Sequence, residues 1–224
     1  MNTKNLKIAV FKDLISIPVI ESNEEMLNIA DVVDNCICKY EQMEMIEYIG
    51  NSIWVRKSLV FKLKNISEKL RAKFPDYKLK IEYGYRHPEV QKMKFERRKK
   101  SVSIEHPELQ GFDLDELTNT MVAHPDTAGH PTGGAVDITI TTSNGDLDMG
   151  TKIADFSDPQ KIVTFCDYIS DEQKENRKLL LELMTSEGFA PFYGEWWHFC
   201  YGDKEWAFFY DKPNAIYSQI NFKI

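Results

Sequence analysis

The chain is organised around one stretch, Gly129-His130-Pro131-Thr132-Gly133-Gly134-Ala135-Val136-Asp137. It runs directly into Ile138-Thr139-Ile140-Thr141, where apolar and polar residues alternate as in a β-strand with one buried face. Asp137 falls on the polar face, and a carboxylate in a protein interior needs a partner. The glycines permit a tight path between His130 and Asp137. We therefore expect these two side chains to converge on one point, as two ligands of a metal site do.

A second motif, Gly194-Glu195-Trp196-Trp197-His198-Phe199, supplies another carboxylate and another imidazole. Catalytic zinc takes three protein ligands from His nitrogen and Asp or Glu oxygen, and it keeps a fourth position for water. His130, Asp137 and His198 complete such a set for one Zn²⁺ ion per chain. Glu195 is then available as the general base. Residues three apart face opposite sides of a regular strand, so the prediction requires a bulge, twist or turn between Glu195 and His198.

Three motifs in this order resemble those of a known enzyme family. They are Tyr85-Arg86-His87-Pro88, then Gly133-x-Ala135-x-Asp137 after His130, and finally Glu195-Trp196-Trp197-His198. They are similar to motifs of the zinc peptidases of the D-Ala-D-Ala dipeptidase and carboxypeptidase group, and most of all to the VanX-type dipeptidases. That group shares its metal site with lysostaphin-type endopeptidases and hedgehog domains. The resemblance implies an α+β fold, with a central antiparallel sheet flanked by helices and the zinc site on the sheet.

The resemblance also implies roles for two residues outside the metal set. Arg86 would stabilise the oxyanion of the tetrahedral intermediate. Asp155 matches the aspartate that holds the substrate's free amino group in VanX-type enzymes, if one residue is inserted after Gly150, and Asp158 is the alternative. An aspartate facing an ammonium group would favour dipeptides with free N-termini, because a longer chain carries no charge at that point.

The chain departs from the family pattern at Ala128. The family usually has serine at this position, two residues before the first ligand, and the serine helps to hold the substrate carboxylate. We expect either that Thr127 or Thr132 takes over this contact, or that the substrate is a dipeptide other than D-Ala-D-Ala.

Composition limits the alternatives. The 224 residues suffice for one domain, and we expect an N-terminal extension over residues 1–54 packed on a peptidase domain over residues 55–224. The formal charge of −7 argues against a nucleic-acid partner. No apolar run approaches the roughly 20 residues of a membrane span. The N-terminus is a poor signal peptide, so a cytoplasmic location is expected, in agreement with four cysteines that we interpret as free thiols.

The hydrophobic pattern predicts several elements. Leu59, Leu63, Ile66 and Leu70 fall on one face of a helix, and Ser170 to Gln173 is a capping box. The segment 101–128 is expected to be a long, partly irregular connection, whose His106 and His124 are alternative metal ligands. The expected helices are Lys57–Lys73, Pro88 to about Lys100 and Ser170–Glu187; the expected strands are Leu79–Tyr85, Val136–Thr141, Glu195–Tyr201 and, antiparallel to it, Trp206–Tyr210.

The predicted function is hydrolysis of D-Ala-D-Ala, or a similar small free dipeptide, by metal-activated water. One alternative is a D,D- or L,D-carboxypeptidase of the same zinc fold that cuts longer cell-wall peptides. The other is a non-catalytic zinc-binding module, which loss of the base would mark, whereas Glu195 is present. The sequence leaves the oligomeric state open.

Overall fold

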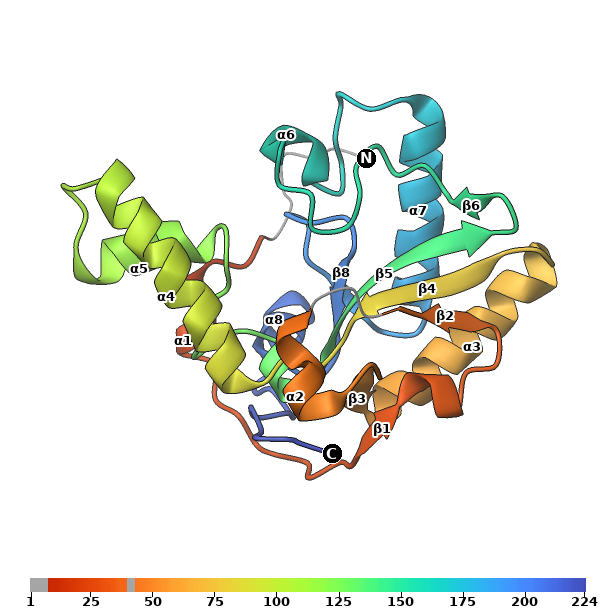
Figure 1. Ribbon diagram of the computed structural model, residues 1–224, viewed down its shortest axis with the longest axis horizontal. Coiled ribbons are helices and arrows are strands. Elements are labelled where there is room, and N and C mark those ends of the chain that lie inside the picture. Colours follow the sequence, from red (N-terminus) through yellow and green to blue (C-terminus); the bar gives the residue numbers. More distant parts are fainter. Residues whose placement is uncertain (1–7, 40–42) are drawn as a thin grey trace.

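A central sheet, six-stranded within residues 8–39 and 43–224 that the computed structural model describes, carries the rest of the fold (Figure 1). The strand order is β2-β4-β5-β8-β7, and β6 pairs with the C-terminal end of β5. Neighbouring strands are antiparallel, except that β2 and β4 are parallel. The strands are β2 (Cys36–Cys38), β4 (Lys78–Tyr83), β5 (Ala135–Thr142), β6 (Gly145–Asp146), β7 (Ala190–Pro191) and β8 (His198–Cys200).

One face of the sheet is apolar and packs against two long helices, α3 (Lys57–Lys73) and α7 (Asp171–Ser186). Alternation along β5 points its apolar residues into this core, while α3 contributes leucine and isoleucine at helical spacing and α7 contributes Leu180 and Met184. Full burial of each such side chain stabilises the fold by about 1.5–3 kcal/mol. The capping box at Ser170 forms as predicted and fixes the start of α7.

The opposite face of β5 is polar and turns toward the remaining helices. It carries Asp137, Thr139 and Thr141, all buried. Figure 1 shows α4 and α5 on the side of the molecule away from α3. The helices not yet given are α1 (Phe11–Ile15), α2 (Ile46–Ile49), α4 (Pro88–Glu105), α5 (Gly111–Asn119), α6 (Pro159–Ile162) and α8 (Lys204–Phe209), with 3-10 turns at Ile29–Asp31, Met43–Met45 and His130–Thr132.

The described residues before position 55 contribute to the core. Strand β1 (Met26–Asn28) pairs with β3 (Trp54–Arg56), and β2 extends the central sheet beside β4. Ile29, Val33 and Ile53 are each at most 2% exposed and belong to the same apolar cluster as β5 and α3. These described residues therefore share the sheet and the core with the later strands.

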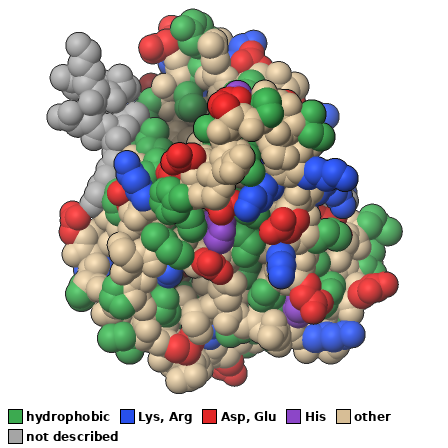
Figure 2. Space-filling model, turned by 90° about the vertical axis from the view of Figure 1, so that its left-hand side faces the viewer, with side chains coloured by type: hydrophobic (Ala, Val, Ile, Leu, Met, Phe, Trp, Pro, Cys, Tyr) green, Lys and Arg blue, Asp and Glu red, His purple; other side chains and the backbone are tan. Residues whose placement is uncertain are grey.

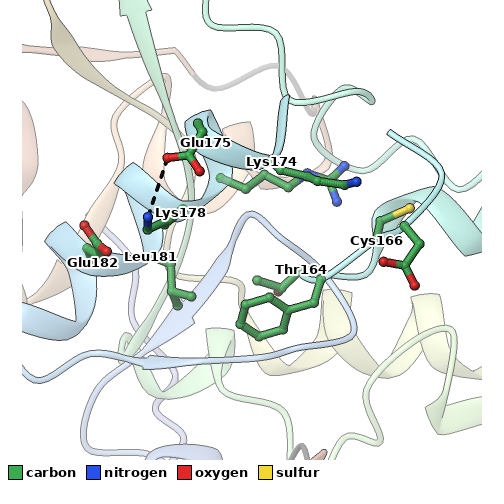
Figure 3. Close-up of a pocket in the computed structure, with 10 residues that line it drawn as sticks. Thr164, Cys166, Lys174, Glu175, Lys178, Leu181 and Glu182 are labelled. Carbon is green, nitrogen blue, oxygen red and sulfur yellow. Dashed lines mark ion pairs between the residues drawn. The ribbon is translucent and has the colours of Figure 1, made fainter. Parts of the chain in front are cut away.

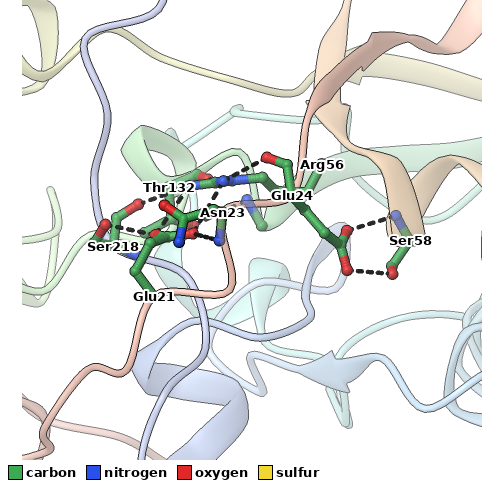
Figure 4. Close-up of polar contacts among 8 residues, drawn as sticks. Glu21, Asn23, Glu24, Arg56, Ser58, Thr132 and Ser218 are labelled. Atoms are coloured by element: carbon green, nitrogen blue, oxygen red, sulfur yellow. Dashed lines mark hydrogen bonds and ion pairs between the residues drawn. The ribbon is translucent and has the colours of Figure 1, made fainter.

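A buried arginine connects three distant parts of the chain (Figure 4). Arg56 is 2% exposed, and its Nε donates to the carbonyl of Thr132 at 2.8 Å. Its Nη1 donates to the carbonyl of Glu24 at 2.7 Å and to the carboxylate of Glu21, and its Nη2 donates to Glu21 and to the carbonyl of Ser218. The N-terminal segment, the loop that carries His130 and the C-terminal segment are thereby fixed to one side chain.

The predicted α+β class is confirmed, but three local expectations are wrong. The segment Trp206–Tyr210 is not a strand, because α8 begins at Lys204 and is capped by Asp203, whose side chain accepts the N–H of Trp206 at 2.9 Å. The strand expected over Glu195–Tyr201 is confined to β8. Helix α4 continues to Glu105 rather than to about Lys100, and α5 occupies part of the connection that follows.

Charged and apolar side chains are mixed on the surface beside α4 and α5. Figure 2 views the side of the molecule on which α4 and α5 lie, where basic, acidic and hydrophobic side chains are interspersed. Among the helices of the described residues, none combines the length and the apolar character needed to cross a membrane.

Candidate active site

The structure brings His130, Asp137 and His198 together on the polar face of the sheet. His130 opens the 3-10 turn before β5, while Asp137 and His198 are paired residues of β5 and β8. Oδ1 of Asp137 lies 3.0 Å from Nδ1 of His198, and Oδ2 lies 3.4 Å from Nε2 of His130. All three side chains are buried, and one donor atom from each lies within 4.8 Å of the others. Two nitrogens and one oxygen therefore face a common point.

The ring nitrogen of His130 that faces away from this point is also held. Nδ1 of His130 lies 2.7 Å from the carbonyl of Gly84, and since a carbonyl can only accept, Nδ1 carries the proton. Burial lowers the pKa of His130 to about 4, so the ring is neutral at pH 7 and its Nε2 offers a lone pair. The tautomer suited to a metal ligand is thus set by the backbone.

Charge at the three residues fits a cation. Burial alone would raise the pKa of Asp137, but the two imidazoles lower it well below its usual range. Burial alone would lower the pKa of His198, but the contact with Asp137 and the nearby carboxylate of Glu205 raise it well above its usual range. The two ring nitrogens of His198 thus face two carboxylates, those of Asp137 and Glu205. The donor set of two imidazoles and one carboxylate is one that catalytic zinc uses, and the residues present fit that ion.

Glu195 comes to the same side as His198 through a turn. Its N–H donates to the carbonyl of Phe192 at 3.0 Å, and the N–H of His198 donates back to the carbonyl of Glu195 at 3.3 Å. The turn is the departure from strand geometry that the spacing required. Burial, with repulsion from Asp137 and Glu205, raises the pKa of Glu195 to about 7, which suits a general base at neutral pH.

Arg86 follows β4 and is held rigidly. Its backbone N–H donates to the carbonyl of His130 at 3.2 Å, which couples it to the metal loop. Its side chain donates from Nε to the hydroxyl of Tyr83 at 3.0 Å and from Nη1 to Oε1 of Gln91 at 2.7 Å. The guanidinium also lies over the ring of Tyr83, 4.4 Å from its centroid. Such support limits the freedom of the cation.

These residues line one cavity of about 340 Å³, a size typical of small-ligand sites. It contains Arg86 and the three candidate ligands together with Glu195. Apolar walls come from Phe156, Phe192 and Trp197, among others. Sequence reasoning missed two further charged residues of the wall, Lys94 and Glu205, because no motif spacing marks either of them.

Asp155 is placed differently from the other predicted site residues. Ala154 and Phe156 line the metal cavity, but Asp155 lines the neighbouring hollow, with Lys80 and Glu82. Its Oδ1 accepts the N–H of Ser157 at 3.1 Å. The alternative residue Asp158 caps α6 by accepting the N–H of Gln160 at 3.2 Å, and it does not line the metal cavity either.

The substitutes expected for the missing serine lie outside the metal cavity. Ala128, Thr127 and Thr132 line a separate small hollow. The hydroxyl of Thr132 donates to the carbonyl of Gly129 at 2.6 Å, and that of Thr127 donates to the carbonyl of His124 at 3.4 Å. Both hydroxyls therefore stabilise their own loop.

The alternative histidine ligands have other partners. The ring of His124 stacks on Phe11 with centroids 4.2 Å apart, and its Nδ1 accepts the N–H of Asp126 at 3.1 Å. His106 lies on the surface, with Nδ1 3.3 Å from Oε1 of Glu108. Neither histidine lines the metal cavity.

One other group of metal-ligating residues occurs in the described part of the chain, formed by Cys200, Asp203 and Glu205. Oδ1 of Asp203 is used as the cap of α8, and the thiol of Cys200 faces the carbonyl of Ala190 at 3.7 Å. Cys200 is fully buried. The first group, whose donor atoms face one cavity, therefore fits a metal ion better than this one.

A different cavity, of about 500 Å³, lies against α7 (Figure 3). The labelled side chains in Figure 3 come from α7 and from the segment around Thr164 and Cys166. Lys178 pairs with Glu175 across the helix surface at 3.6 Å. None of the predicted site residues lines this cavity.

Comparison with known proteins places the chain in a family. The family model described as D-Ala-D-Ala dipeptidase, in the M15 peptidases, matches residues 47–219, which include all the predicted site residues. A D-alanyl-D-alanine dipeptidase of Synechocystis sp. is 34% identical over 104 residues, which are 42% of this chain and 42% of that protein. The matched region thus spans less than half of that relative.

Two solved structures are also similar to the chain. One is the D,D-pentapeptidase VanY from a VanB-type resistance cassette in complex with Zn(II), at 19% identity and a TM-score of 0.41, covering 76% of this chain and 84% of that one. The other is the LD-carboxypeptidase LdcB, at 19% identity and a TM-score of 0.46, covering 88% and 75%. The family match extends over more than half of the sequence, and on that ground the chain belongs to the D-Ala-D-Ala dipeptidase family of the M15 peptidases.

Proposed function

We propose that the protein is a zinc-dependent dipeptidase that hydrolyses D-Ala-D-Ala or a similar free dipeptide. The observation that carries the proposal is the convergence of His130, Asp137 and His198 on one point, with the carboxyl-bearing Glu195 lining the same cavity. One zinc ion per chain and a cytoplasmic location belong to the proposal.

The three ligands would hold the metal through Nε2 of His130, a carboxylate oxygen of Asp137 and Nδ1 of His198. When bound, the metal supplies Lewis acidity and lowers the pKa of water in its open position toward neutral. Asp137 contributes the single negative charge of the ligand set, which leaves a net positive site.

Glu195 moves the proton. Its carboxylate takes a proton from the attacking water and afterwards delivers it to the leaving amine. Desolvation of the carboxyl raises the pKa of Glu195 to about 7, so the carboxylate is basic enough to accept a proton at neutral pH. Glu195 thus acts as the general base. A non-catalytic zinc-binding module would lack such a base.

Arg86 stabilises the negative charge that develops on the carbonyl oxygen of the substrate. Tyr83 and Gln91 hold the guanidinium in place before the reaction, so little reorganisation is needed when the charge appears. Asp155 remains a prediction as the partner of the substrate ammonium. It could act there only where the amino end of the substrate extends past Ala154 and Phe156 into the neighbouring hollow.

That hollow favours a second candidate function. It measures about 710 Å³, and it is lined by Thr139, two residues beyond Asp137 on the same face of β5. A longer cell-wall peptide could therefore continue along the sheet from the metal cavity, as a carboxypeptidase would require. Its polar and charged lining, with Lys80 and Glu82, suits a peptide backbone.

Hydrolysis of a panel of peptides by zinc-loaded protein tests the proposal. The panel contains D-Ala-D-Ala, its N-acetylated form, D-Ala-D-Ser, L-Ala-D-Glu and a cell-wall tripeptide. We expect cleavage of free D-Ala-D-Ala and not of the acetylated form. Cleavage of only the blocked or longer peptides would replace the dipeptidase with the carboxypeptidase, and no cleavage of any peptide by zinc-bound protein would overturn both.

A further inference from the structure

The second ring nitrogen of His198 faces a carboxylate that belongs to none of the sequence motifs. Nε2 lies 3.5 Å from Oε2 of Glu205, while Nδ1 lies 3.0 Å from Oδ1 of Asp137. We propose that Glu205 is a positioning residue, which holds His198 in the tautomer and orientation that present Nδ1 to the metal. This inference rests on the metal site of the proposed function.

The position of Glu205 is fixed by the turn between β8 and α8. Gly202 has a φ of 79°, which reverses the chain after the strand, and Asp203 then caps the helix. Ala207 is fully buried and anchors the helix on the core. Glu205, in the first turn, is therefore directed back toward His198, and only 15% of its side chain is exposed.

Oε2 of Glu205 is buried and forms no hydrogen bond of normal length with any residue in 8–39 or 43–224. A buried carboxylate oxygen without a donor is costly, since its loss of hydration is not compensated. The donor that faces Oε2 of Glu205 is the Nε2–H group of His198. The separation of 3.5 Å exceeds an ordinary hydrogen bond, so a small adjustment of either side chain completes the contact.

His130 gives the internal comparison. Its off-metal nitrogen donates to a neutral carbonyl, that of Gly84, at 2.7 Å. In the proposed role, Glu205 likewise accepts from the off-metal nitrogen of His198, but its acceptor is a charged carboxylate. A carboxylate at Nε2 makes the imidazole a more basic ligand and adds negative charge near the cation. Glu205 is therefore expected to increase metal affinity more than a carbonyl would.

A purely structural role for Glu205 makes a different prediction. An acidic residue in the first turn of a helix stabilises the helix by about 0.3–1 kcal/mol through the dipole. Its removal would then lower the melting temperature of the metal-free protein and leave the affinity for zinc unchanged. A role as part of a second metal group with Cys200 and Asp203 would give a second zinc equivalent, which Cys200→Ser would abolish.

The experiment measures zinc affinity by competition with a chelator, for the full chain and for Glu205→Gln and Glu205→Ala. We expect Glu205→Ala to bind zinc about 10- to 100-fold more weakly. Glu205→Gln should lose less, because its amide oxygen still accepts the N–H without the charge. The matched control is Glu175→Gln, which removes a largely exposed carboxylate on α7 and should leave the affinity unchanged.

Nuclear magnetic resonance of the histidine ring nitrogens gives a second measurement. In zinc-loaded wild type the His198 ring should carry its proton on Nε2, and this proton should exchange faster with solvent in Glu205→Ala. Unchanged zinc affinity in both Glu205 variants, while His198→Ala loses zinc, would overturn the role of Glu205 and leave the proposed function intact. Failure of the wild type to bind zinc would overturn both. The near-isosteric Glu205→Gln keeps the test valid if Glu205→Ala does not fold.

Discussion

Asp137 and His198 are direct partners across adjacent antiparallel strands, and their side chains meet with Oδ1 3.0 Å from Nδ1. Paired positions on two strands have side chains on the same face, so the backbone register itself creates this contact. The two residues are far apart in the sequence, and the pairing of β5 with β8 brings them together.

The first prediction concerns the two strand ligands. Loss of a residue that only supports a metal ligand typically weakens metal binding by about 10- to 100-fold. His198→Ala and Asp137→Asn should each weaken zinc binding by more than this. Hydrolysis should be lost in parallel, because the same residues are proposed to bind the metal. Chelator competition and a zinc titration of activity give the two measurements. Near-normal zinc affinity in His198→Ala would refute its assignment as a ligand.

A second prediction separates metal binding from proton transfer. Glu195→Gln should keep the zinc affinity of the wild type and reduce kcat by about 10²- to 10⁴-fold, because the amide cannot accept the proton of the attacking water. Glu175→Gln again serves as a control that keeps full activity. A Glu195→Gln protein with normal kcat would exclude Glu195 as the base.

The pH dependence of the rate follows from the same residue. Burial raises the pKa of Glu195 to about 7, so its carboxyl is protonated, and inactive as a base, below that pH. We therefore expect kcat/KM to fall as the pH decreases below about 7, with the slope of one proton. Residual activity of Glu195→Gln should lack this acidic limb. A limb that persists in the variant would be assigned to another group.

Arg86 provides a prediction about the transition state. Arg86→Lys keeps the charge but cannot retain both contacts, to the Tyr83 hydroxyl and to Gln91. We expect kcat to fall by about 10²- to 10³-fold with a smaller change in KM, since the interaction strengthens as the oxyanion forms. Zinc affinity should be unchanged. A change in KM alone would indicate that Arg86 binds the substrate in its ground state.

Much of the fold follows from local patterns in the sequence. Helix α3 has the predicted bounds, because its leucine spacing has the helical period and its ends are marked. The metal residues were predicted from residue types and spacing, and the structure brings them together. By contrast, the aromatic run after Gly202 has strand propensity, yet the cap at Asp203 and packing of Ala207 give a helix.

The unpredicted parts of the site depend on the tertiary path of the chain. Glu205 reaches His198 only because the chain reverses at Gly202, and no periodicity encodes this contact. The predicted role of Asp155 was inferred from a local motif, but the course of the surrounding loop decides which hollow its carboxylate enters. The division of the chain at residue 54 stays a prediction.

The last prediction concerns Arg56, which links the His130 loop to both ends of the chain (Figure 4). Burial alone would raise the pKa of Glu21, but hydrogen bonds from Ser218 and the charge of Arg56 lower it below its ordinary value of 4.5. Because the pKa of Glu21 is lower in the folded state, its carboxylate stabilises the fold fully at pH values above the ordinary pKa of 4.5. Its contribution is lost as the pH falls through the folded-state pKa.

Arg56→Met should therefore lower the free energy of unfolding by about 3–5 kcal/mol, because it leaves the carboxylate of Glu21 without its cation and breaks the bond to the carbonyl of Thr132. Denaturant unfolding at neutral pH measures the change. The exposed Arg71→Met on α3 is the matched control and should shift stability by no more than about 0.5 kcal/mol. In Glu21→Gln, the Arg56→Met effect should be smaller, since the two residues are coupled. Equal losses in both backgrounds would show that Arg56 acts through its backbone carbonyl partners alone.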